Sequence, residues 1–155
     1  QSIAKRKRWI VRHRRILPPC VGARQGDGKG MIELLIDAQL PTLNEYTVAN
    51  RSHWSKGAAF KKQVESLIGG YIMLSIAQKK LRSIKKPCEI FIEWHEGTMR
   101  RDVDNIQSAQ KFILDALQAY KIIANDNRKH VKQIHHIIVD DVRDYVVVRF
   151  EEEKQ

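Results

Sequence analysis

The stretch CEIFIEWHEGTMRRDVDNIQSAQKFILDALQAY, residues 88–120, decides the fold. Its first eight residues alternate apolar and polar side chains, which predicts a strand with one apolar face formed by Cys88, Ile90, Ile92 and Trp94. Apolar residues then recur at helical spacing from Ile106 to Tyr120, which predicts a helix, and we expect Asp104 or Asn105 to cap it. A strand followed by a helix is the basic unit of an α/β domain.

The flanking segments extend this pattern in both directions. Apolar periodicity predicts further strands at 32–36, 131–139 and 145–150, and a long amphipathic helix at about 55–81. The segment Pro41-Thr42-Leu43-Asn44 ends the first strand, and we expect a loop after it. The order β-α-β-α-β-β predicts one α/β (α+β) domain in which two main helices pack on a small mixed sheet.

Two adjacent glycines lie in the middle of the long helix. Each Gly costs roughly 1 kcal/mol relative to Ala in a helix interior. Gly69 and Gly70 therefore indicate a kink or a close packing contact, which a helix of a second subunit could use.

The charge of the chain points to a polyanionic partner. Its 155 residues include 28 Lys and Arg against 18 Asp and Glu, a formal net charge of +10, so nucleic acid is the first partner to consider. Residues 1–30 hold nine of the cations and one acid, which leaves a net charge of +2 for residues 31–155. We place a boundary there and leave two interpretations of the basic leader open. It is either foreign to a natural protein that starts at Met31, or an arginine-rich arm that is disordered alone.

Several protein classes are excluded by what the sequence lacks. No apolar stretch is long enough to span a membrane, and Cys20 and Cys88 lack the spacing of a zinc site or a disulfide framework. Ile106 and Gln107 exclude an EF-hand, and the Gly-rich run of the leader does not fit a P-loop. We expect a reducing, intracellular setting.

The acidic pair Asp102 and Asp104 is the most informative short motif. In extended chain the two carboxylates would point to the same side and could converge on one hard cation such as Mg²⁺, which takes one or two carboxylates and several waters. Arg100 and Arg101 could offset their charge or hold phosphate. The structural alternative is that the acids only cap the helix and complement its dipole.

A polar stripe follows the acidic pair. Asp104, Ser108, Lys111 and Asp115 are spaced by four, three and four residues, so on a continuous helix they share one face. Lys111 and Asp115 could equally be a simple exposed ion pair.

Further motifs accompany this stripe: Lys111-x-x-x-Asp115-Ala116-Leu117, then Asn125-Asp126, and the earlier Pro41-x-x-Asn44. Together with Asp102-x-Asp104-Asn105 they resemble the RusA family of Holliday junction resolvases over about residues 31–150. The resemblance implies a RusA-like fold and a homodimer. It also implies Mg²⁺-dependent paired nicks in four-way DNA junctions during recombination and repair, with Mn²⁺ able to substitute.

The resemblance also implies roles for particular residues. Asp102, Asp104 and Asp126 would hold the metal and be catalytic, and Lys111 would be the catalytic lysine. Ser108 stands where the family usually has that lysine, so we infer a three-residue insertion that keeps the spacing from Lys111 to its following Asp. The family commonly has Asp at the position of Asn125. The loss of that carboxylate either weakens metal binding here, or Asn125 coordinates the metal through its amide oxygen. A cytoplasmic bacterial, prophage or phage protein is implied.

Basic and aromatic residues suggest where DNA would bind. The predicted contacts are Asn44, Lys61, Lys62, Lys79, Lys80, Arg100 and Arg101, although solvated helix ends would also account for the lysines. Tyr46, His53 and Trp54, in the expected loop, could stack on bases, but we expect Trp54 in the core. We expect His135 and His136 to be structural, one facing inward and one outward, and His130 lies near Asp126 in the sequence.

Three functional hypotheses follow. The first is a metal-dependent junction endonuclease, and the second is a catalytically weak junction-binding relative without nuclease activity. The third reads Asp102-x-Asp104 as the nucleotide-sugar site of a transferase, for which the chain lacks a nucleotide-binding half.

Overall fold

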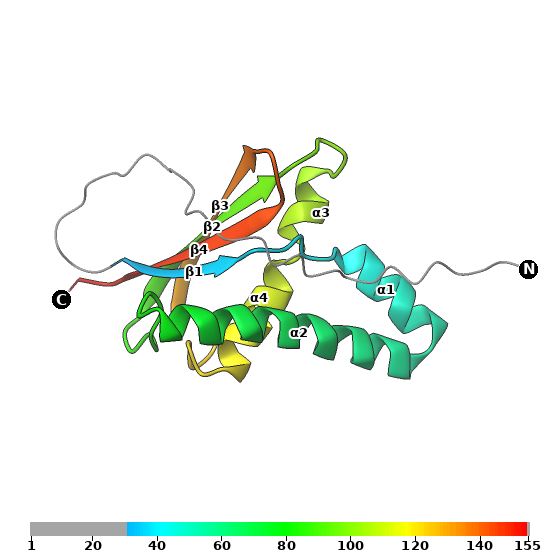
Figure 1. Ribbon diagram of the computed structural model, residues 1–155. Coiled ribbons are helices and arrows are strands. Elements are labelled where there is room, and N and C mark those ends of the chain that lie inside the picture. Colours follow the sequence, from blue (N-terminus) through cyan, green and yellow to red (C-terminus); the bar gives the residue numbers. More distant parts are fainter. Residues whose placement is uncertain (1–30, 155) are drawn as a thin grey trace, which may run out of the picture.

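The computed structural model describes residues 31–154, so the basic leader 1–30 and the boundary predicted at its end lie outside the described residues. These residues form four strands and four helices, and Figure 1 shows α2 and α4 beside the sheet, with α1 and α3 beyond one end of it. In chain order the elements are β1 (Ile32–Ile36), α1 (Leu43–Ser52), α2 (Trp54–Ala77), β2 (Cys88–Glu96), α3 (Val103–Gln107), α4 (Gln110–Ala119), β3 (Val131–Asp140) and β4 (Tyr145–Glu152).

The sheet is mixed, as the sequence predicted. Its strand order is β1-β4-β2-β3, with β4 antiparallel to both β1 and β2, and β2 parallel to β3. The parallel pair is joined by the crossover through α3 and α4, whereas β3 and β4 follow each other by a short turn without pairing. The fold is therefore a small α+β domain, and the predicted fold class is confirmed.

The core lies between one face of the sheet and the helices α2 and α4. Register places Leu34, Val148 and Ile92 side by side across three strands, and all three are fully buried. The helices contribute Ile68 and Ile72 from α2 and a cluster from α4 that includes Phe112, Ile113 and Leu117. Burying an aliphatic side chain of this size contributes about 2 kcal/mol each, so this layer dominates the stability of the fold.

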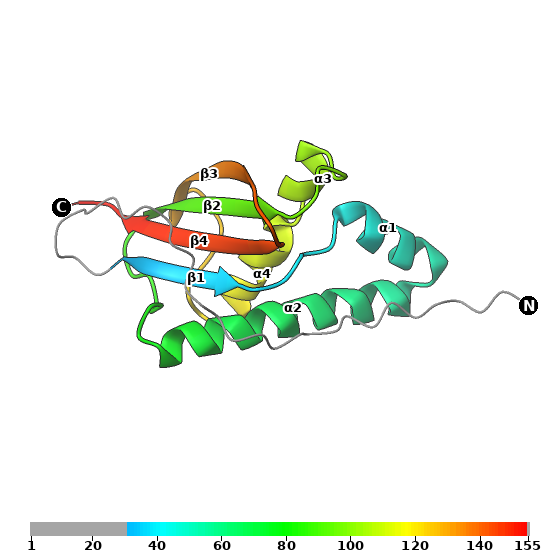
Figure 2. The same cartoon turned by 45° about the horizontal axis from the view of Figure 1, so that its top comes forward.

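The other sheet face is covered by no helix or strand among residues 31–154 (Figure 2). It carries ion pairs in place of a second core. Arg149 of β4 lies between Glu33 of β1, at 3.2 Å, and Glu93 of β2. Desolvation by itself would lower the pKa of Arg149. The carboxylates of Glu93 and Glu33 outweigh this effect, so the pKa is raised above its ordinary value.

One predicted loop is a helix. Residues 43–52 form α1, which begins at a capping box in which Thr42 Oγ1 accepts from the Glu45 amide at 3.3 Å and Glu45 accepts from the Thr42 amide at 2.8 Å. None of the residues of α1 is fully buried, so the helix has no strong apolar stripe. Our prediction of a loop was wrong because it relied on apolar periodicity and overlooked the Thr-x-x-Glu signal.

The helix predicted from Ile106 to Tyr120 is also divided. It starts earlier, with Asp102 as N-cap, and a tightened turn at Ser108 and Ala109 separates α3 from α4. The Ser108 hydroxyl donates to the carbonyl of Asn105 at 2.6 Å, a local bond of the kind that bends helices. The predicted N-caps, Asp104 and Asn105, lie inside α3 instead.

The adjacent glycines of α2 have different surroundings. A Cβ on Gly69 would lie 2.1 Å from the ring tip of Tyr120, whereas a Cβ on Gly70 would meet nothing within 4 Å. The predicted close contact is thus made at Gly69, and its partner is the residue after α4 of the same chain. Among residues 31–154, no helix combines the length and apolar composition needed to cross a membrane.

Candidate functional site

The acidic pair lies at the start of α3, just beyond the carboxyl end of β2 (Figure 1). Asp102 is the N-cap and Asp104 is in the first turn, so the two are not in extended chain as the sequence suggested. Both side chains are exposed, and neither carboxylate has a hydrogen bond or ion pair with another described residue. Asp102 makes no side-chain capping bond. The helix amides and dipole at this end favour negative charge.

The loop that delivers the pair is fastened at several points. Arg101 binds the carboxylate of buried Glu96, with Nε at 3.2 Å from Oε2, and donates from Nη1 to the carbonyl of Leu40 at 2.8 Å. The Gly97 amide donates to Asp144 Oδ1 at 2.7 Å. These bonds join the ends of three strands and hold the loop that precedes α3. The guanidinium of Arg101, predicted to contact DNA, is therefore occupied by internal partners, while Arg100 is exposed.

Two motifs far apart in sequence meet at α3. Asn44 Nδ2, in the first turn of α1, donates to Asn105 Oδ1 at 3.0 Å. The amide of Leu43 donates to Ser108 Oγ at 3.2 Å, which satisfies one of the free amides at the start of α1. The Pro41-x-x-Asn44 segment and the Asp102-x-Asp104-Asn105 segment are thus side by side, and Ser108 has a structural role between them.

The lysine of the polar stripe, Lys111, is the second residue of α4. Lys111 is exposed, with its Nζ 3.5 Å from Asp115 Oδ1, and Lys61 of α2 lies 3.3 Å from Asp115 Oδ2. Asp115 Oδ2 is buried and has no hydrogen bond of good geometry within residues 31–154, so the Lys61 contact is an ion pair only. The stripe from Asp104 to Asp115 is interrupted by the turn between α3 and α4.

The third predicted metal ligand lies elsewhere. Asp126 falls in the loop between α4 and β3, and that loop leads to Val131, which pairs with Cys88 at the beginning of β2. The amide of Cys88 donates to the carbonyl of His130 at 3.0 Å. The acidic pair follows the opposite end of β2, nine residues or about 30 Å along the strand. One chain therefore does not bring Asp126 to Asp102 and Asp104.

The side-chain amide of Asn125, next to Asp126, makes a local hydrogen bond. Asn125 Oδ1 accepts from the amide of Asn127 at 3.0 Å, which forms a turn before β3. Within the described residues, no three His, Cys, Asp or Glu side chains are grouped so that they could hold a metal ion.

A histidine network lies beside the acidic end of the sheet. His95 is buried, with Nδ1 2.9 Å from Asp141 Oδ2, and its ring stacks on Tyr145 at 4.0 Å. The amide of Val142, then His95 and Tyr145, hold the pKa of Asp141 below its ordinary value. Burial, with the hydrogen bond to Asp141, raises the pKa of Tyr145 to about 12. No periodic pattern in the sequence indicated this network, because Asp141 comes from the turn after β3.

The two adjacent histidines of β3 face opposite sides, as predicted. His135 stacks on Phe91 at 4.3 Å on the face without helices. His136 Nδ1 accepts from Trp94 Nε1 at 2.9 Å, and its Nε2 lies 2.7 Å from Gln110 Oε1, so His136 is neutral there. Burial lowers the pKa of His136 in agreement with this arrangement.

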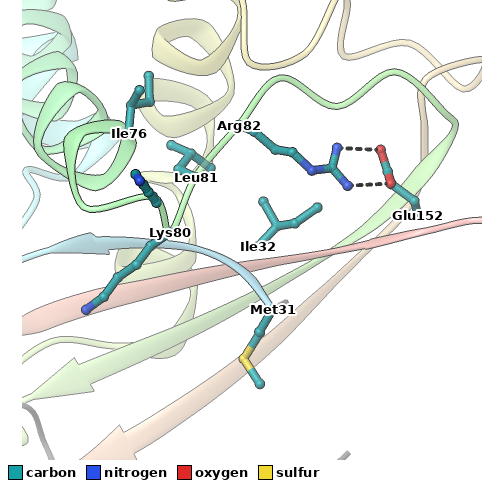
Figure 3. Close-up of a pocket in the computed structure, with 8 residues that line it drawn as sticks. Met31, Ile32, Ile76, Lys80, Leu81, Arg82 and Glu152 are labelled. Atoms are coloured by element: carbon teal, nitrogen blue, oxygen red, sulfur yellow. Dashed lines mark hydrogen bonds and ion pairs between the residues drawn. The ribbon is translucent and has the colours of Figure 1, made fainter. Parts of the chain in front are cut away.

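The predicted DNA-binding lysines lie at the two ends of α2. Lys61 and Lys62 are exposed near its beginning, and Lys79 and Lys80 follow its end. The latter two border a hollow of about 690 Å³ whose other lining residues are Met31, Ile32, Ile76, Leu81, Arg82 and Glu152. In Figure 3 the guanidinium of Arg82 faces Glu152 through two bonds, of 3.1 and 2.8 Å, so that cation is neutralised.

Trp54 is on the surface, contrary to our expectation. It is the first residue of α2 and is 75% exposed, whereas Trp94, the other tryptophan in residues 31–154, is buried. Tyr46 instead packs inward against Phe60 and Phe112 at centroid distances of 6.1 Å. The sequence could not distinguish these aromatics because the boundary between α1 and α2 was not predicted.

No protein-family model matches the sequence, and a search of curated proteins finds no match either. The class that the fold and the site define is a small α+β domain with two acids at a helix start, which have no partner among residues 31–154 and follow the exposed Arg100. The likeness to RusA therefore stays a prediction from the sequence motifs.

Proposed function

We propose that the chain is a Mg²⁺-dependent, structure-selective endonuclease that resolves four-way DNA junctions by paired symmetric nicks. The observation that carries this proposal is the meeting of two distant motifs. Asn44 and Asn105 bind each other 61 residues apart, directly beside two carboxylates that have no partner among residues 31–154. A structural acid pair would be expected to make side-chain capping bonds or ion pairs, and among residues 31–154 neither carboxylate makes either kind of contact, although Asp102 is the N-cap residue.

The donor set fits a magnesium ion. Mg²⁺ prefers oxygen ligands and commonly takes only one or two carboxylates, which leaves positions for water and phosphate. When bound, the ion would polarise a phosphodiester and lower the pKa of a coordinated water. Asp102 and Asp104 would hold it, Arg100 would bind a neighbouring phosphate, and Lys111 would stabilise charge on the phosphate oxygens.

Asp126 needs a second copy of the chain if it belongs to the same site. Because it lies at the opposite end of β2 and β3 from the acidic pair, it would reach the pair of a partner subunit only. A two-fold dimer would then contain two composite sites, one for each of the strands to be cut. The predicted homodimer and the predicted third metal ligand can therefore be tested in one experiment.

A mixing experiment tests this proposal. Asp104→Asn and Asp126→Asn proteins are each assayed alone on a labelled four-way junction with Mg²⁺, and then after subunit exchange in equal amounts. Each variant alone should be inactive. After random exchange, about half of the dimers are heterodimers, and each heterodimer has one intact site. The mixture should therefore have about a quarter of the intact sites of wild type, which has two per dimer. The matched control Asp140→Asn changes an exposed carboxylate and should retain activity. Inactivity of wild type on junctions would refute the endonuclease, and full activity of Asp126→Asn would remove that residue from the site.

A junction-binding relative without nuclease activity is the second candidate. It is favoured by the separation of Asp126 from the acidic pair and by Asn125 at a position where RusA-like proteins commonly have Asp. Binding of a junction by wild type without nicking in Mg²⁺ or Mn²⁺ would select this candidate. A metal readout independent of cutting is the melting temperature, which Mg²⁺ should raise in wild type but not in Asp104→Asn.

A further inference from the structure

A helical arm extends from the sheet on the side of the acidic pair. We define the arm as residues 43–62, which comprise α1 and the beginning of α2. Figure 1 shows it reaching beyond the ends of the strands. α1 has ten residues, so the arm is about 15 Å long.

The tip of the arm is rigid. His53 alone joins the two helices, since its amide donates to the Ala49 carbonyl of α1 and its Nδ1 accepts from the Ser55 amide of α2 at 3.2 Å. A Cβ on Gly57 would lie 2.3 Å from Asn50 Oδ1 and 2.9 Å from Asn50 Cα, so the helices are in close contact behind the tip. The conformation of the tip is therefore determined by capping and packing.

Trp54 stands exposed on this rigid tip. The residue is 75% exposed, and its indole stacks on the ring of His53, with ring centroids 5.8 Å apart and an interplanar angle of 28°. An indole normally buries 150–250 Å², roughly, and an exposed one held by rigid backbone is available to a partner at low entropic cost.

The surroundings of Trp54 are cationic. Arg51 and Lys56 are exposed on either side of it, and Lys61 and Lys62 follow along α2. The acid of the arm, Glu45, is used in the capping box at the other end of α1. A flat aromatic surface between cations suits a nucleobase whose flanking phosphates meet Arg51 and Lys56.

The base of the arm contacts the proposed catalytic end. Asn44 binds Asn105, and the aromatic cluster of Tyr46, Phe60 and Phe112 fixes the arm to α4. DNA bound at the acidic pair would therefore pass along the arm. At 3.4 Å per base pair, the 15 Å of α1 corresponds to about four or five base steps.

We propose that Trp54 stacks on an unpaired or unstacked base at the branch point of the DNA, about four or five nucleotides from the phosphate held at Asp102 and Asp104. This inference rests on the proposed function for its choice of DNA as the partner. The arm thereby distinguishes branched from linear DNA, because only a branch presents an open base face to a rigid indole.

Equilibrium binding without metal tests the proposal independently of cutting. Full-length wild type, Trp54→Ala, Trp54→Phe and the control Val48→Ala are titrated in EDTA onto a four-way junction with 2-aminopurine at the crossover and onto a linear duplex of the same sequence. Val48 is a matched control because it is 69% exposed on the same arm. Wild type should quench the crossover 2-aminopurine. Trp54→Ala should abolish quenching and weaken junction binding about tenfold or more, with duplex binding within about twofold.

Trp54→Phe should retain most of the quenching, and Val48→Ala should behave as wild type. Equal junction affinity and quenching in wild type and Trp54→Ala would overturn the proposal, as would absence of junction binding by wild type. A change of sedimentation in Trp54→Ala with unchanged DNA binding would assign the indole to a protein contact and also overturn it. If wild type cuts junctions but Trp54→Ala changes neither binding nor quenching, the endonuclease proposal stands and the Trp54 proposal fails. If quenching depends on Trp54 but wild type does not cut, only the endonuclease proposal fails.

Discussion

Adjacent arginines at the edge of the proposed site should have opposite roles. Arg101 is paired with Glu96, whose side chain is 5% exposed, whereas Arg100 is exposed and has no ion pair among residues 31–154. Truncation of Arg101 would leave a buried carboxylate without its cation and the Leu40 carbonyl without its donor. Truncation of Arg100 would remove only a surface charge.

The magnitude follows from the burial of the pair. Breaking a buried ion pair costs 3–5 kcal/mol, and because Arg101 keeps 18% of its side-chain exposure we expect about 3 kcal/mol for Arg101→Ala. That loss corresponds to a decrease in melting temperature of about 10 °C for a domain of this size. Arg100→Ala should change the free energy of unfolding by about 0.5 kcal/mol or less.

Urea unfolding and salt-dependent junction binding separate the two effects. Arg100→Ala should lower the slope of log affinity against log salt by about one, the loss of one phosphate contact. The double variant Glu96→Gln with Arg101→Ala should recover about half of the lost stability, because an uncharged amide costs less to bury. Equal destabilisation by the two single variants, or loss of junction affinity in Arg101→Ala with unchanged stability, would refute this reasoning.

Three further outcomes follow from the structure. Gly70→Ala should raise the free energy of unfolding by about 1 kcal/mol through helix propensity, whereas Gly69→Ala should lose this gain by displacing Tyr120, measured by urea unfolding. Lys79 follows α2 with φ 58°, so Lys79→Gly should stabilise by about 0.5–1 kcal/mol in the same assay while weakening junction binding. The pKa of Tyr145 is raised from its ordinary value near 10 to about 12 in the folded state. The free energy of unfolding should therefore be pH-independent in this respect below pH ~10 and fall between about pH 10 and 12. Tyr145→Phe should remove that part of the pH dependence from stability measured across this range.

The parts of the fold that sequence predicted are those where burial repeats along the chain. β2 alternates because Ile90 and Ile92 face the core while Glu89 and Glu93 do not, and α2 buries one residue per turn through Val64, Ile68 and Ile72. α1 has no such repeat, so only its capping box could have identified it. The division between α3 and α4 depends on a hydroxyl that binds α1, and no local pattern contains that contact.

The site was predictable in part. The acidic pair and Asn44 were found by motif, and the structure brings those motifs together. The separation of Asp126 was accessible to topological reasoning, because a strand, a crossover helix and a parallel strand place the end of the first strand and the start of the next at opposite ends of the sheet. The exposure of Trp54 was not accessible, since it depends on where the joint between α1 and α2 falls.

The pairing of cations around the site argues for a role of the acidic pair beyond capping. Arg101 precedes Asp102 directly, yet it binds Glu96, and Lys61 of α2 and Lys111 of α4 pair with Asp115. These three cations are thus held by other acids, whereas the exposed Arg100 has no ion pair among residues 31–154, and both carboxylates lie at the same helix start. The dipole of a helix start favours a carboxylate there by about 0.3–1 kcal/mol. Because the two carboxylates have no partner among residues 31–154, the proposed function predicts that they would be available to a metal ion and to the phosphate that accompanies it.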